Sequence, residues 1–153
     1  MSQSDPGDAR DDQTGRFRAP GAVPPVRPLS PHLQVWRFHV TMTASILHRI
    51  TGAALAGGAV LVLLWLAALA CGPDSYALFL ALMASPIGLL IWFGVTIALL
   101  YHWASGIRHL VWDTGRGFAL PTANAMAWAS IIFAILGAIA FWAWLFASGK
   151  VSL

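Results

Sequence analysis

The stretch SILHRITG carries the first side chains that could do chemistry, Ser45, His48 and Arg49. At spacings of i, i+3 and i+4 these residues share one face of a helix. A hydroxyl, an imidazole and a guanidinium that converge can hydrogen-bond a carbonyl oxygen or neutralise a carboxylate, for which the planar fork of arginine is well suited. The alternative is that His48 and Arg49 only reach for lipid headgroups and anchor the helix. The spacing alone leaves both interpretations open.

A second group lies in HWASGIRHLVWD, where His102 and His109 are separated by i, i+7, with Ser105 and Gly106 between them on the same face. At 1.5 Å per residue His102 lies about 9 Å inward from Arg108. An imidazole at that depth in a membrane has no water to bond, so it needs a partner, either on a neighbouring helix or in a cofactor. A face of small residues elsewhere in the chain favours close approach of a helix or a flat cofactor: Gly52, Ala53, Ala56, Gly57 and Gly58.

If the flat cofactor is haem, helix geometry limits its ligands. His102 and His109 are about 10.5 Å apart along one helix, too far for the two axial positions of one iron. A second haem would need another pair of histidines within the spans, and the sequence has none. One haem is therefore the maximum, with its second ligand from His48 or from another protein. His48 lies beside Arg49 near the membrane surface, which suits haem propionates better than iron and favours a ligand from a partner.

The composition indicates a membrane protein. Of 153 residues, 58% are hydrophobic and 10% are charged, whereas about a quarter are charged in an ordinary soluble domain. The net charge of +3 comes from basic residues beside apolar runs, which indicates topology signals and no nucleic-acid partner. Cys71 is the only cysteine, which excludes an internal disulfide or a thiolate-bound iron-sulfur cluster within this chain.

The apolar runs predict an all-α fold, an integral membrane bundle of three transmembrane helices. The spans are expected at about residues 44–71, 86–110 and 123–147, each long enough to cross hydrocarbon. Residues 1–26 are rich in Pro, Gly, Asp and Arg and predict a disordered tail. Residues 27–43 mix Pro, aromatic and basic residues and predict an interfacial segment, so the membrane domain covers residues 27–153.

The orientation follows from the distribution of Lys and Arg. Arg27, Arg37 and Arg49 precede the first span, and Arg108 and Arg116 flank the connection between the second and third. The opposite side carries only Lys150, which follows the third span, and the connection around Asp74 has no Lys or Arg. Since basic residues favour the cytoplasmic side, the N-terminus is expected in the cytoplasm and the C-terminus outside.

Taken together, the motifs RPLSPHL, SILHRITG and HWASGIRHLVWD resemble the cytochrome b subunit of bacterial succinate dehydrogenase, one of two small membrane anchors of respiratory complex II. The resemblance covers roughly residues 27–153, with both longer motifs at the expected ends of the expected spans. It implies that His102 is an axial ligand of haem b and that Ser45 and Arg49 belong to a ubiquinone site. It also implies that His48 contacts haem propionates.

Two further residues take less definite roles from the resemblance. It implies that Asp113 lies near the quinone site, and that His109 is structural or contacts a propionate, so that His48, Arg49 and His109 form the cofactor surroundings.

The same resemblance implies an assembly in the bacterial inner membrane. A flavoprotein subunit would oxidise succinate, an iron-sulfur subunit would pass electrons to ubiquinone, and a second small anchor subunit would share the single haem. The chain by itself would not oxidise succinate. The alternatives are the anchor of a quinol:fumarate reductase or a structural membrane subunit without a redox group; a small transporter is disfavoured because the sequence lacks internal repeats.

Overall fold

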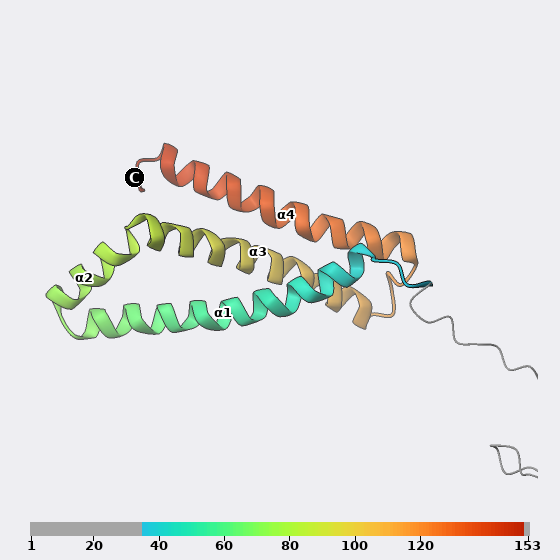
Figure 1. The fold of residues 1–153 in the computed structure, drawn as a ribbon, viewed down its shortest axis with the longest axis horizontal. Coiled ribbons are helices and arrows are strands. Elements are labelled where there is room, and N and C mark those ends of the chain that lie inside the picture. Colours follow the sequence, from blue (N-terminus) through green and yellow to red (C-terminus); the bar gives the residue numbers. More distant parts are fainter. Residues whose placement is uncertain (1–34, 152–153) are drawn as a thin grey trace, which may run out of the picture. The chain divides into compact units, whose positions relative to one another are not determined.

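The computed structural model describes residues 35–151, whose helices all belong to one compact unit, Phe38–Leu153. The helices are α1 Val40–Ala70, α2 Pro73–Met83, α3 Pro86–Asp113 and α4 Leu120–Ala147. Three of them, α1, α3 and α4, are long and apolar enough to cross a membrane. In Figure 1, α1 and α4 run in the same direction and α3 runs opposite to both. The predicted all-α bundle with three spans is confirmed for this part of the chain, while the predicted tail and the segment up to residue 34 lie outside the described residues.

The helices extend beyond the predicted spans. The first begins at Val40 instead of near Ala44, and α3 continues to Asp113 instead of ending near Leu110. The last begins at Leu120, so Pro121 lies in its first turn and does not precede it. Proline is tolerated there because the N–H groups of a first turn have no partner within the helix. The apolar runs therefore predicted the membrane-crossing core of each helix, and short segments of mixed polar and apolar residues extend it.

The short helix α2 was not predicted. The segment between the first two expected spans was read only as a connection, but Pro73 opens a helix there. The acidic Asp74 lies in its first turn, where the helix dipole favours a negative charge. The following corner is tight: Ser85 caps α3 by accepting a hydrogen bond from the Gly88 N–H at 3.2 Å. A Cβ on Gly88 would lie 2.5 Å from the Leu82 carbonyl oxygen, so only glycine fits where α2 meets α3.

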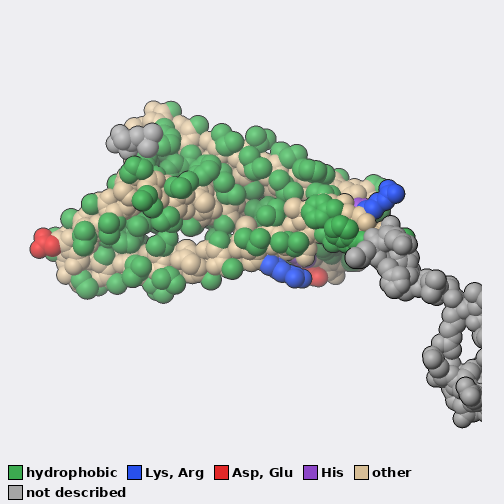
Figure 2. All heavy atoms as spheres, in the orientation of Figure 1, with side chains coloured by type: hydrophobic (Ala, Val, Ile, Leu, Met, Phe, Trp, Pro, Cys, Tyr) green, Lys and Arg blue, Asp and Glu red, His purple; other side chains and the backbone are tan. Residues whose placement is uncertain are grey.

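Small residues form the interior of the bundle. The buried positions of α4 recur every three or four residues along one face and, with one exception, are small: Ala123, Ala127, Ser130, Ala134, Ala138 and Trp142. Small side chains let membrane helices approach closely, where packing and not hydrophobicity drives association. Many large apolar side chains are exposed. Hydrophobic side chains are spread along the visible face of all the helices in Figure 2. This inverted arrangement fits a lipid surrounding.

Two hydrogen bonds between helices fix their relative positions. The Tyr101 hydroxyl donates to the Ala44 carbonyl oxygen at 2.7 Å and joins α3 to the beginning of α1. The Trp142 Nε1–H donates to Thr96 Oγ1 at 3.2 Å and joins α4 to the other half of α3. Because Ala44 directly precedes Ser45, the first of these bonds also holds the turn of α1 that carries the SILHRITG residues.

Candidate functional site

Three histidines from two helices meet near one end of the bundle. The rings of His48 on α1 and His102 on α3 are stacked, with centroids 4.0 Å apart and planes 9° apart. The His109 ring lies 5.0 Å from that of His48. In stacked rings the faces meet and the nitrogens do not converge, and within residues 35–151 no three His, Cys, Asp or Glu side chains are arranged to hold a metal ion. The cluster is therefore a packed group of separate imidazoles.

The edge of the His102 ring that bears Nδ1 faces α1. His102 Nδ1 lies 3.2 Å from the His48 carbonyl oxygen and 3.4 Å from Thr51 Oγ1. A carbonyl oxygen can only accept a hydrogen bond, so this contact requires the proton on Nδ1. The neutral ring then has its lone pair on Nε2, which is the form in which histidine binds a metal.

Gly52 makes this arrangement possible. A Cβ at residue 52 would lie 3.2 Å from His102 Cε1 and 3.7 Å from Nδ1, so the absence of a side chain lets the ring approach the backbone of α1. Gly58 also lies against α3, since a Cβ at this residue would be 3.5 Å from Val95 Cγ1. Ala53, Ala56 and Gly57, the other members of the small-residue face, are exposed. Part of that face therefore receives α3, and the rest is uncovered in this chain.

These contacts fit an axial haem ligand. The half-buried His102 offers one lone-pair nitrogen, its other nitrogen is held by a backbone carbonyl, and it projects from a membrane span. Metal-binding histidines characteristically donate their second ring N–H to a carbonyl or carboxylate, which fixes the ring. His48 and His109 lie beside it, as expected for residues around a cofactor edge.

Ser45 and Arg49 line a separate hollow on α1. It has a volume of about 370 Å³ and its other lining residues are Thr41, Met42 and Ile46. The Arg49 side chain is exposed and Ser45 is half-buried, so both can meet a ligand. His48 does not join them, because it is one residue from Arg49, about 100° around the helix, and it faces α3. The expected convergence of three side chains thus holds for Ser45 and Arg49, with His48 in the histidine cluster.

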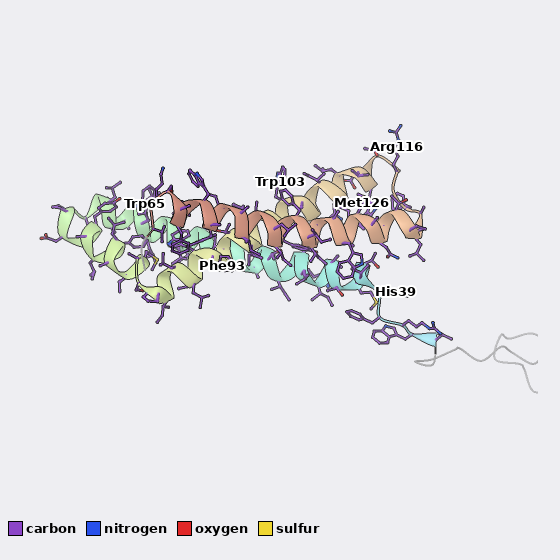
Figure 3. All side chains as sticks on the ribbon, turned by 90° about the horizontal axis from the view of Figure 1, so that it is seen from above. His39, Trp65, Phe93, Trp103, Arg116 and Met126 are labelled. Carbon is purple, nitrogen blue, oxygen red and sulfur yellow. The ribbon has the colours of Figure 1, made fainter. Side chains whose placement is uncertain are left out.

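The last two predicted site residues lie toward the end of α3. Asp113 is exposed at its last residue, and the half-buried His109 ring packs edge-on against Trp112 at 5.2 Å. The hollow is lined by α1 alone, so Asp113 is not part of it. His39 and Arg116 mark this same end of the helices in Figure 3, with Trp65 toward the other end.

Arg108, counted among the basic residues that flank the connection, is buried within the bundle. Its side chain is only 2% exposed, its Nη2 lies 3.4 Å from Ser105 Oγ, and its guanidinium lies 4.9 Å from the centre of the Trp112 ring. Arginine reaches such a place because its long apolar stem packs while its planar head lies against an aromatic ring. The signal was present in the sequence, since Tyr101, Ser105 and Arg108 follow one another at i, i+4 and i+7 and are all buried.

Comparison with known proteins identifies the family of the chain. Residues 24–143 match the family described as the succinate dehydrogenase/fumarate reductase transmembrane subunit. The chain is 40% identical over 119 residues to the succinate dehydrogenase cytochrome b556 subunit of Paracoccus denitrificans, an alignment that covers 75% of this chain and 92% of that protein. It is 38% identical over 116 residues to the cytochrome b556 subunit of Rickettsia felis, covering 76% of this chain and 90% of the relative.

A mitochondrial relative is similar as well. The succinate dehydrogenase cytochrome b560 subunit of Mus musculus is 39% identical over 114 residues, covering 72% of this chain and 66% of that protein. The resemblance that the motifs predicted is confirmed. With its three apolar helices and these relatives, the chain belongs to the family of succinate dehydrogenase and fumarate reductase transmembrane subunits.

Proposed function

We propose that this chain is the haem-binding membrane anchor of a succinate dehydrogenase and forms one side of its ubiquinone site. The observation that carries the proposal is the contact between His102 Nδ1 and the His48 carbonyl oxygen at 3.2 Å, because it leaves the lone pair of Nε2 available to bind a metal inside a membrane span. The names of the relatives, cytochrome b556 and b560, support haem b as the group that this donor meets.

His102 would hold one haem b, with the second axial ligand supplied by a partner subunit. Haem b, when bound, takes up and gives back single electrons. His48 lies against one face of the His102 imidazole and keeps it from turning, and its own Nδ1 is buried without a hydrogen-bond partner among residues 35–151. That nitrogen and the ring of His109, which lies 5.0 Å from the His48 ring, would contact the propionates.

Ser45 and Arg49 would bind ubiquinone in the hollow on α1. The Ser45 hydroxyl can donate to a quinone oxygen, and the exposed Arg49 guanidinium can stabilise the charge that develops as quinone oxygens gain electron density. Asp113 would act at the rim of the site, contributed from α3.

The remaining subunits would be a flavoprotein, an iron-sulfur protein and a second small membrane anchor. The exposure of α1 supports a partner within the membrane, since among its 31 residues only Ala44, Thr51 and Gly58 are buried. The second anchor would cover part of this surface, and lipid would cover the rest. The soluble subunits would dock at the end of the bundle that carries the Ser45 hollow.

The proposed location is the bacterial inner membrane with the N-terminus in the cytoplasm. Membrane-impermeant maleimide tests it with the native thiol, because Cys71 is exposed at the end of α1. Cys71 should react from outside the cell, whereas Arg116→Cys in a Cys71→Ser background should react only in inverted vesicles. Detergent-solubilised membranes, in which both thiols should react, are the control. Reaction of Cys71 only from the cytoplasmic side would reverse the orientation and the proposed docking end.

The quinone assignment is tested in the assembled complex by Ser45→Ala. Loss of one neutral hydrogen bond costs about 1 kcal/mol, so electron transfer from succinate to ubiquinone should slow by about fivefold. Succinate oxidation by an artificial soluble acceptor should be unchanged. The matched control is Ser148→Ala, which removes an exposed hydroxyl at the opposite end of the bundle. Equal quinone reduction in the Ser45→Ala and control complexes would remove Ser45 from the site.

A further inference from the structure

Thr51 presents an oxygen lone pair to the edge of the His102 ring that bears Nδ1, not to the Nε2 that is proposed to bind iron. Its hydroxyl lies 2.7 Å from the Leu47 carbonyl oxygen and 3.1 Å from that of His48, so its proton is engaged by the backbone of its own helix. Toward His102 Nδ1, 3.4 Å away, the same oxygen can therefore act only as an acceptor. Thr51 is 8% exposed, which keeps water from replacing it in this role.

From this geometry we infer that Thr51 is a positioning residue that sets how strongly His102 donates to the haem iron. The inference rests on the proposed ligation of haem by His102. An acceptor on the outer ring N–H of a metal-bound histidine raises the basicity of the ligating nitrogen. Stronger donation stabilises the ferric state, so Thr51 lowers the midpoint potential of the haem.

The simpler explanation is that the Thr51 hydroxyl only donates to backbone carbonyl oxygens of its own helix, as threonines in membrane spans often do. Thr96 on α3 provides a direct comparison. Its hydroxyl donates to the Trp92 carbonyl oxygen at 2.8 Å, and its oxygen accepts the Trp142 Nε1–H at 3.2 Å. Both threonines bond their own helix and accept an N–H from another residue. They differ in that Thr51 faces the proposed iron ligand and Thr96 faces an indole.

Gly52 lets the His102 ring come close enough to α1 for its Nδ1 to lie 3.4 Å from Thr51 Oγ1. Since a Cβ there would already lie 3.2 Å from His102 Cε1, the ring cannot approach α1 further once any side chain is added. Gly52 thus leaves room for the ring, and Thr51 Oγ1 is a second acceptor for the Nδ1–H that His102 donates to the His48 carbonyl oxygen. At Gly57, on the same helix, a Cβ would have nothing within 4 Å, so no ring packs against the backbone there.

The test compares Thr51→Val, Thr51→Ser and Thr96→Val in the complete complex by redox titration of the haem. The valine removes the acceptor and keeps the side-chain shape, so the potential should become more positive. The ferric-to-ferrous ratio at the wild-type midpoint should change by roughly threefold, about 28 mV for a one-electron couple, since the His48 carbonyl still holds the ring. Thr51→Ser and Thr96→Val should both titrate like the wild type.

Each other outcome has a definite meaning. A Thr51→Val potential equal to that of Thr96→Val, or a Thr51→Ser potential shifted as far as that of Thr51→Val, would overturn the assignment to the hydroxyl. If Thr51→Val does not assemble, Thr51→Ala removes the same oxygen without filling its space and is compared with Thr51→Ser. Failure of both to assemble would assign the hydroxyl to folding and overturn the inference. Haem that persists unchanged in His102→Leu would instead refute the proposed ligation, which separates the two failures.

Discussion

Replacing His102 with leucine should leave an assembled complex without its b-type haem. Leucine is apolar and fills a similar space in a membrane span, so α3 should still form, but it offers no donor to iron. Loss of a group that only supports a metal ligand already lowers affinity by about 10–100-fold, so loss of the ligand itself should lower the haem content of the purified complex at least as far. The measurement is haem per complex, determined as the pyridine haemochrome.

The control for this change is His39→Leu. His39 precedes the first turn of α1, is exposed, and makes no capping hydrogen bond through its side chain. The His39→Leu substitution removes an imidazole from the same end of the bundle without changing the histidine cluster, so the haem content should equal that of the wild type. Normal haem content in His102→Leu, with normal assembly, would assign the ligand to another residue.

Changing Arg49 to leucine should have the largest effect on quinone reduction. Arg49 is exposed and shares the α1 hollow with Ser45, and a charge-assisted hydrogen bond is stronger than a neutral one. Losing such a bond costs about 1.5–3 kcal/mol of transition-state stabilisation. The rate of electron transfer from succinate to ubiquinone should therefore fall on the order of 10–100-fold. The reaction with an artificial soluble acceptor should continue, because electrons then leave before they reach this chain.

Arg49→Lys separates binding from anchoring. Lysine keeps a long cationic side chain that reaches lipid headgroups equally well, but it lacks the planar fork. Quinone reduction should therefore also fall in Arg49→Lys. Arg116→Leu is the matched control, since it removes an exposed arginine from the connection at the same end of the bundle. Full activity in Arg49→Lys would make Arg49 a headgroup anchor and contradict the quinone assignment.

The membrane helices could be predicted because crossing the hydrocarbon core of a bilayer requires about 20 consecutive apolar residues, and such a run can be recognised in the sequence without knowing the fold. The short helix α2 could not, since it has no polar face to separate from an apolar one, and its beginning depends on Pro73 after Gly72, whose φ is +108°. The helix ends at Val40 and Leu120 were also missed, because the segments before the continuous apolar runs mix threonine or proline with apolar residues and show no pattern that marks a helix start.

Where the candidate residues share one helix, their spacing indicates which side chains lie together. Ser45 and Arg49, at i and i+4, line the same hollow on α1. The stacking of His48 on His102 could not be derived, because no local pattern states which residues of α1 face α3 across 54 positions of sequence. For the same reason Thr51 received no role, and the charge of Arg108 was interpreted by its place along the chain although its side chain is buried.

The central claim, that His102 carries the haem of a succinate dehydrogenase anchored by this chain, is tested most directly by absorption spectroscopy of purified wild-type and His102→Leu complexes. The spectra are recorded before and after succinate is added, and then after dithionite. The account predicts a reduced b-type α-band in the wild type, and no such band in His102→Leu with either reductant. A wild-type complex without a b-type band even after dithionite, or a His102→Leu complex with the full band, would contradict it.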